Sequence, residues 1–130
     1  MHLFYKAIGS LWCSAIKDTV FFNNHGWIHL RYDSKGHKRI AAAIRLRFFL
    51  LQHVSEVIQQ SKVMLKQTSG FITSRNGVQR RVTYYEIAHK VNKGKYHITV
   101  ILRRIEEGKL HYYSIRRTRA KIKKALEGLH

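Results

Sequence analysis

Three short turn signals divide the second half of the chain into segments that alternate apolar and polar residues, and this pattern restricts the fold most. Asn76-Gly77 is the strongest two-residue hairpin signal, and further turns follow at residues 92–95 and 106–109. The alternation is clearest in the segment between these last two turns. The pattern predicts an antiparallel meander of about four strands: residues 71–74, 78–91, 96–105 and 110–117.

The first half and the C-terminus have a helical period instead. Apolar residues recur at helical spacing in residues 1–15, 38–51 and 54–65, and a basic helix is expected at about 118–129. Residues 23–26 have turn chemistry. Helices segregated from an antiparallel sheet define an α+β domain. We therefore expect a single domain, with N-terminal helices packed on a four-stranded antiparallel β-meander and a short C-terminal basic helix: residues 1–130.

The formal net charge is +18, from 25 Lys and Arg against 7 Asp and Glu. Such a charge indicates a partner, which is nucleic acid, an anionic membrane surface or an acidic protein. No run approaches the roughly 18 apolar residues of a membrane span, and the cations recur from Lys6 to Lys124 rather than in one tail. We therefore predict no membrane partner and favour a surface that follows nucleic-acid phosphates, with an acidic protein as the alternative.

Several classes of active site lack their residues in this chain. The carboxylates form no DxD arrangement, and two of them lie in the predicted turn at residues 106–109. His25 and His29 have an i, i+4 spacing without the Glu of a zinc protease. Cys13 is the only cysteine and has no neighbouring base. No nucleophile elbow, Walker loop or dinucleotide fingerprint is present. We therefore predict no metal and no cofactor.

Metal-free cleavage of RNA needs only side chains that this chain has. The substrate supplies its own 2′-hydroxyl nucleophile, and the protein supplies a base, an acid, cations for the phosphate and aromatic rings for the bases. Two clusters combine these groups. One is residues 25–31, with His25 and His29, and the other is residues 111–117, with Arg103 across a predicted hairpin.

The alternation of a regular strand presents a difficulty in the second cluster. His111 and Tyr113 would point to one face, and Ser114 and Arg116 to the other, unless a bulge intervenes. One of the two pairs should then face the core, and the pattern does not choose between them. Each residue also has a structural alternative, such as a packed histidine at His29 or tyrosines that only favour strands.

Two stretches resemble a known group of toxins. VFFNNHGWIHL, at residues 20–30, resembles the opening of bacterial and phage toxin domains in which GW-x-HI precedes a helix rich in Arg and Leu. YHITVILRRIEEGKLHYYS, at residues 96–114, is similar to their closing hairpin, in which VVLR and GK-x-H-F/Y-Y-S recur. These motifs resemble the ribonuclease superfamily of barnase, EndoU, the tRNA-cleaving colicins and RelE. The resemblance covers residues 20–117 and implies helices followed by a four-stranded antiparallel sheet.

The resemblance also implies a set of catalytic residues, with His25 as an additional candidate: His29, Arg103, His111, Tyr113 and Ser114. We expect one of two histidines in this set, His29 or His111, to act as general base or acid. Arg103 is expected to hold the scissile phosphate, to which Tyr113 and Ser114 donate hydrogen bonds. Further cations are expected to contact the RNA backbone: Arg31, Lys38, Arg80, Arg81, Arg116 and Arg117.

These observations predict a metal-independent endoribonuclease toxin that cleaves cellular RNA, either tRNA or mRNA, in the bacterial cytoplasm. The net charge of +18 predicts an acidic antitoxin or immunity protein that covers the basic cleft. The main alternative is a non-catalytic basic nucleic-acid-binding protein. Another is a RelE/ParE-like toxin that inhibits a protein target without cleaving RNA.

Overall fold

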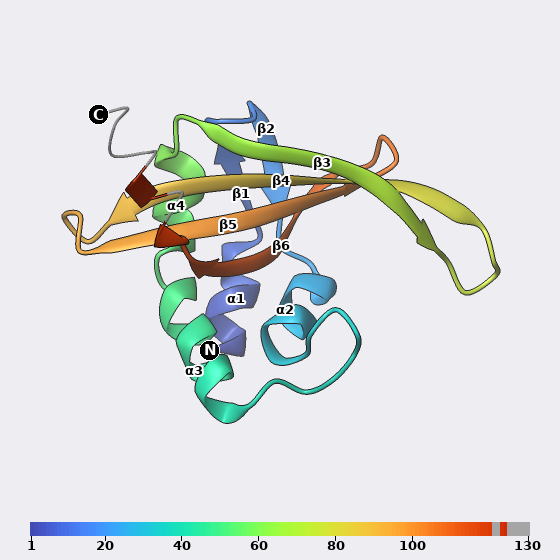
Figure 1. Cartoon of the computed structure of the whole chain (residues 1–130), viewed down its shortest axis with the longest axis horizontal. Helices are drawn as coiled ribbons and strands as arrows, with labels where there is room; N and C mark the ends of the chain where they lie inside the picture. The colour runs from blue at the N-terminus through green and yellow to red at the C-terminus, as the bar shows by residue number, and fades with distance from the viewer. Residues whose placement is uncertain (121–122, 125–130) are drawn as a thin grey trace.

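The computed structural model describes residues 1–120, 123 and 124, and these form an α+β fold, as predicted (Figure 1). Helices α1, α2 and α3 lie below a long, curved sheet in this view. The helices are α1 (His2–Ile8), α2 (Asn24–Arg31), α3 (Ala41–Leu51) and α4 (Val54–Gln60). The strands are β1 (Ser10–Cys13), β2 (Asp18–Phe21), β3 (Met64–Thr73), β4 (Gln79–Val91), β5 (Tyr96–Ile105) and β6 (Leu110–Arg117).

The sheet has six strands in the order β1-β2-β6-β5-β4-β3, so the predicted four-stranded antiparallel meander is only part of it. The meander from β3 to β6 is antiparallel throughout, and β5 and β6 have the predicted bounds. The hairpin of β1 and β2 extends it, because β2 runs parallel to β6 and pairs Val20 with Leu110. Parallel strands need a long connection, and no local pattern reveals such a pairing.

Helix α1 is shorter than the helix expected over residues 1–15. Gly9 has a φ of +66°, a left-handed conformation that favours glycine, and the helix ends at the preceding Ile8. The next apolar residues form β1 instead, which places Cys13 in the core. A strand of four residues is too short for its alternation to be told from a helical stripe.

Helix α2 begins where a turn was expected. Asn23 is its N-cap, and its side-chain oxygen accepts a hydrogen bond from the Gly26 amide at 3.2 Å. Asparagine favours both tight turns and helix starts, so its presence did not distinguish the two. The cap begins the helix that carries His29.

The boundary between α4 and β3 also differs from the prediction. The helix expected over residues 54–65 ends at Gln60, and β3 begins at Met64 rather than at residue 71. β3 is an edge strand with mostly exposed side chains, so it lacks the apolar alternation of a half-buried strand. The basic helix predicted at residues 118–129 falls mostly outside the described residues, and the structure therefore shows no such element.

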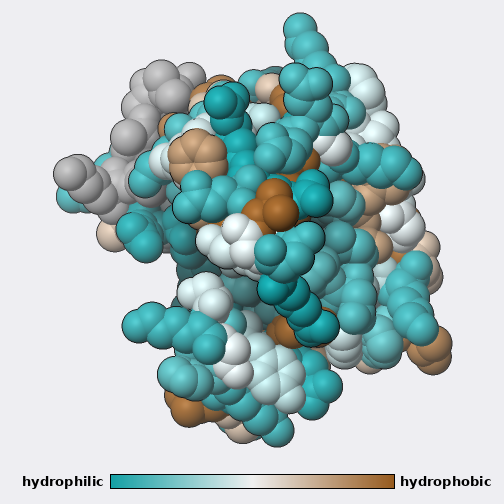
Figure 2. All heavy atoms as spheres, turned by 90° about the vertical axis from the view of Figure 1, so that its right-hand side faces the viewer, coloured by the Kyte–Doolittle hydropathy of each residue, from teal (hydrophilic) through white to brown (hydrophobic). Residues whose placement is uncertain are grey.

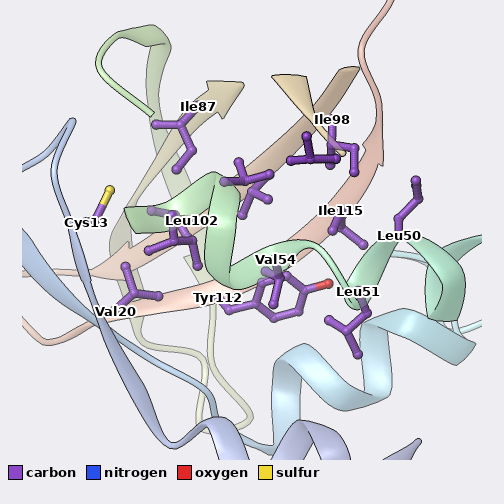
Figure 3. Close-up of a cluster of buried hydrophobic side chains, with 14 of the residues drawn as sticks. Cys13, Val20, Leu50, Leu51, Val54, Ile87, Ile98, Leu102, Tyr112 and Ile115 are labelled. Carbon is purple, nitrogen blue, oxygen red and sulfur yellow. The ribbon is translucent and has the colours of Figure 1, made fainter. Parts of the chain in front are cut away.

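The core lies between the inner face of the sheet and the helices, and Tyr112 is its largest fully buried side chain (Figure 3). The Tyr112 ring stacks on Phe22 at a centroid distance of 5.1 Å and meets Tyr5 edge-on at 5.9 Å. Each fully buried aliphatic side chain stabilises the fold by about 1.5–3 kcal/mol relative to exposure. They include Leu50, Leu51, Val54, Ile87, Ile98, Leu102 and Ile115.

Gly26 allows α2 to pack directly on β6. A Cβ atom on this glycine would lie 2.6 Å from Cδ1 and 2.8 Å from the carbonyl oxygen of Tyr112, and it would also meet the Tyr5 hydroxyl. These distances are too short for a real contact. The missing side chain therefore sets how closely α2 approaches the sheet, and with it the position of His29.

We expect Gly26→Ala to destabilise the fold. An exposed helical Gly→Ala change gains about 1 kcal/mol, but overpacking against an immobile backbone oxygen costs about 1–3 kcal/mol. Urea unfolding measures the net effect. Gly70→Ala is the control, since a Cβ there meets no atom within 4 Å. An unchanged or higher midpoint for Gly26→Ala would show that α2 does not need this close approach.

Candidate active site

Strand β6 contains a bulge at Tyr113. Leu102 of β5 pairs with Tyr112, while the preceding Ile101 pairs with Ser114, so Tyr113 is an extra residue in the ladder. Such a bulge sets two residues of one strand opposite a single residue of its neighbour and bends the bulged strand.

The bulge removes the conflict in the alternation of β6. The strand buries side chains against the core on both sides of the bulge: Leu110, Tyr112 and Ile115. Its candidate site residues therefore lie on the opposite face of the sheet: His111, Tyr113, Ser114 and Arg116. We call this the open face. It continues onto β5 and β4 through Arg103, which pairs with His111 on one side and Tyr84 on the other.

Tyr113 is the centre of an aromatic and cationic cluster with His29, Tyr84 and Arg103, which we call the site cluster. The centroid of its ring lies 4.3 Å from that of His29 and 5.3 Å from that of Tyr84. The Arg103 Cζ atom lies 4.8 Å from the same centroid, within cation–π distance. The four side chains come from α2, β4, β5 and β6. The structure thus brings together His29, Arg103 and Tyr113, which the sequence analysis had selected from separate segments.

Two arginines that the sequence analysis did not select surround His29. The Arg39 side chain donates from Nε to the His29 carbonyl oxygen at 3.1 Å and from Nη2 to His29 Nδ1 at 3.3 Å. Arg47, on α3, has a buried Nε that finds no hydrogen-bond partner among the described residues. The charges of both arginines act on His29, whose ring contacts Tyr113.

The contact from Arg39 determines the tautomer of His29. A guanidinium group can only donate hydrogen bonds, so His29 Nδ1 accepts and the proton of the neutral ring is on Nε2. In the free protein, Nε2 of this imidazole is therefore a hydrogen-bond donor rather than a base.

The surroundings of His29 also hold its ring neutral. Burial lowers its pKa to about 4, and the positive charges of Arg39, Arg47 and Arg103 add to the effect. Only Asp33 acts in the opposite direction. Three guanidinium groups near one histidine make its surroundings positive, and a bound phosphate would offset the charges that disfavour the imidazolium.

His111 is a second neutral histidine beside Arg103. Burial lowers its pKa, and the neighbouring charges of Arg103, His25 and Lys109 contribute further. Arg103 thus lies within electrostatic range of both His29 and His111. A phosphate held by Arg103 would have a histidine available from α2 and another from β6, as acid–base chemistry at phosphorus requires.

The other predicted residues differ in their surroundings. Ser114 is half-buried beside Tyr113, and His25 is exposed on α2. Arg116 forms an ion pair with Glu86 at 2.6 Å, so its charge already has a carboxylate partner. The remaining predicted RNA contacts are exposed or half-buried on α2, the loop after it, β4 and the end of β6: Arg31, Lys38, Arg80, Arg81 and Arg117.

The sequence did contain a signal for one of the missed residues. Arg47 lies between Leu46 and Phe48 in the most apolar helix of the chain, where a cation is unusual unless it has a function or a partner. Arg39 gave no such signal, because it lies in the loop before α3 among other polar residues. Its contact with His29 depends on how that loop folds back on α2.

Comparisons of this chain with protein-family models, curated proteins and solved structures found no match. The superfamily resemblance of residues 20–117 therefore stays a prediction. No helix in the described part of the chain is both long and apolar enough to cross a membrane. Residues 1–120, 123 and 124 contain no group of three His, Cys, Asp or Glu side chains placed to hold a metal ion.

The charges around His29 predict its titration. We expect its ring to titrate at about 4 in the free protein, and added inorganic phosphate to raise this pKa. Replacing Arg47 by Met removes one positive charge but keeps the bulk of the side chain, so it should raise the pKa as well. NMR titration of the ring protons measures all three values. Arg45→Met, on the exposed side of the same helix, is the control. A His29 pKa near the ordinary 6.5 in the wild type would contradict this account.

Proposed function

We propose that this chain is a metal-independent endoribonuclease toxin. The observation that carries the proposal is the contact of His29 and Arg103 with Tyr113, next to Arg39 and Arg47 and with His111 beside Arg103. The cluster holds cations for a phosphate, neutral histidines for proton transfer and rings for bases. These are the groups that cleavage of RNA by its own 2′-hydroxyl requires.

The tautomer of His29 suggests how the two histidines divide the work. We assign His111 as the general base, because its lowered pKa keeps it neutral near pH 7 and able to accept the 2′-hydroxyl proton. The 2′-oxygen then attacks phosphorus, and the bond from phosphorus to the 5′-oxygen breaks. His29 acts as the acid in its imidazolium form: the bound phosphate raises the pKa of the ring, and Nδ1 takes up a proton when Arg39 Nη2 turns from it to the phosphate. Nε2 then gives its proton to the leaving 5′-oxygen, and Nδ1 keeps its own. The products are a 2′,3′-cyclic phosphate and a 5′-hydroxyl.

The arginines then stabilise the charge that develops on phosphorus. Arg103 is held against the Tyr113 ring, and the buried Nε of Arg47 is a donor without a hydrogen-bond partner in the described part of the chain. Donors that are fixed before the reaction stabilise a transition state without reorganising. Tyr113 stays a neutral hydroxyl donor, because burial raises its pKa.

The proposal includes the setting that the sequence suggests. The toxin would act on tRNA or mRNA in the bacterial cytoplasm, where its net charge of +18 favours binding to RNA. The cell that produces it would need an acidic antitoxin or immunity protein to cover the site cluster. No cofactor takes part in the proposed chemistry.

The first test is incubation of the purified protein with total bacterial RNA in EDTA. We expect discrete fragments that end in 2′,3′-cyclic phosphate. His29→Ala and His111→Ala should each lower the rate by about 100-fold or more, while RNA binding persists. His37→Ala is the matched control, because this histidine is exposed in the loop after α2. RNA that is bound but intact would favour the non-catalytic binding protein, and toxicity without binding or cleavage would favour inhibition of a protein.

A second test separates the acid from the base. A nucleoside 3′-phosphate ester of p-nitrophenol has a leaving group that needs no proton. His29→Ala should therefore regain most of its activity on this ester, whereas His111→Ala should stay inactive, because the 2′-hydroxyl still needs a base. Recovery by His111→Ala instead would reverse the two roles.

A further inference from the structure

The hairpin of β3 and β4 extends beyond the rest of the sheet and curves towards the helical side of the molecule (Figure 1). β3 and the first part of β4 belong to the longest stretch of the chain without a carboxylate, since no Asp or Glu lies between Glu56 and Glu86. Five cations lie in the same stretch: Lys62, Lys66, Arg75, Arg80 and Arg81. Figure 2 faces the side from which the hairpin projects, and that side is mostly hydrophilic, with a hollow between the sheet and the helical part.

The alternation of β4 separates its two adjacent arginines. Tyr84 pairs with Arg103 and contacts Tyr113, so it faces the site cluster. Counting back by two along the strand places Arg80 on this open face and Arg81 on the other. Arg81 is paired with Phe71 of β3 and lines a small cavity there, away from the site.

Between Arg80 and Tyr84 the same face of β4 carries Val82, which neighbouring groups bury. Opposite it on β3 is Gly70, which adds no side chain to this face and where a Cβ would meet no atom within 4 Å. Four residues of strand span about 13 Å. Successive phosphates of one duplex strand are separated by roughly 3.4 Å along the helix axis, and by more in an extended strand. A phosphate at Arg80 is therefore at most about four nucleotides beyond a phosphate held at Arg103.

We propose that the open face of the β3–β4 hairpin is an extended RNA subsite. The substrate strand leaves the scissile phosphate at Arg103, passes Tyr84 and has a later phosphate bound by Arg80. This inference rests on the proposed ribonuclease function and specifies its substrate class. The preferred substrate is RNA that continues for several nucleotides beyond the cleaved bond, rather than a dinucleotide.

The test compares the cleavage of a dinucleoside monophosphate with that of a 12-nucleotide RNA that has the same two nucleotides at the cleaved bond. We expect Arg80→Ala to lower the ratio of kcat/KM for the long over the short substrate by about tenfold. Arg81→Ala, its neighbour on the opposite face, should lower this ratio far less. Arg45→Ala, exposed on α3, controls for the loss of one positive charge and should leave both rates as in the wild type. Equal losses for Arg80→Ala and Arg81→Ala would overturn the subsite.

A second measurement tests the RNA path without cleavage. It uses the 12-nucleotide RNA with a 2′-deoxy residue at the cleaved bond, which lacks the nucleophile, and measures its binding affinity at several salt concentrations. Loss of one phosphate contact should reduce the slope of log K against log salt by about 0.7 for single-stranded RNA. We expect this change for Arg80→Ala and a smaller one for Arg81→Ala. If the wild type cleaves neither substrate but shows these slopes, the ribonuclease proposal fails and the RNA path remains. Unchanged slopes for both variants would overturn the path itself.

Discussion

The bulge at Tyr113 is the feature on which both the core and the candidate active site depend. Without the extra residue, β6 could not bury Tyr112 and Ile115 and also keep its polar residues on one face. With it, the strand contributes to the hydrophobic core along its whole length and still presents His111 and Tyr113 to solvent. One inserted residue thus lets a single strand contribute both to the core and to the candidate active site.

The second determinant of the candidate active site is which arginines the few carboxylates pair with. Asp18 pairs with Arg104 at 2.6 Å, and Glu86 pairs with Arg116 at the same distance, so these acids neutralise arginines next to the site cluster. Arg103 instead contacts the Tyr113 ring. Burial lowers the pKa of His29 most, and the like charges of Arg39, Arg47 and Arg103 lower it further. A bound phosphate would relieve the repulsion between these cations, as the proposed function requires.

How far the sequence could predict the structure depended on the length and burial of each element. β5 and β6 were predicted to the residue, because half-buried strands between clear turns alternate over many positions. β1 was missed because its four residues were too few to show a period, and β3 was largely missed because an exposed edge strand has no apolar alternation. Asn23 marked a change of structure correctly but as a turn rather than as a helix cap.

The sequence by itself determined the strongly basic character of the chain, its α+β class and the choice of His29, Arg103 and Tyr113 as candidates. Only the tertiary structure decided that these three meet, that Arg39 and Arg47 join them, and that Arg116 is already paired. The reason is that hydrophobic periodicity reports which face of each element is buried, but not which elements become neighbours. Here the parallel pairing of β2 with β6 and the close approach at Gly26 made that choice.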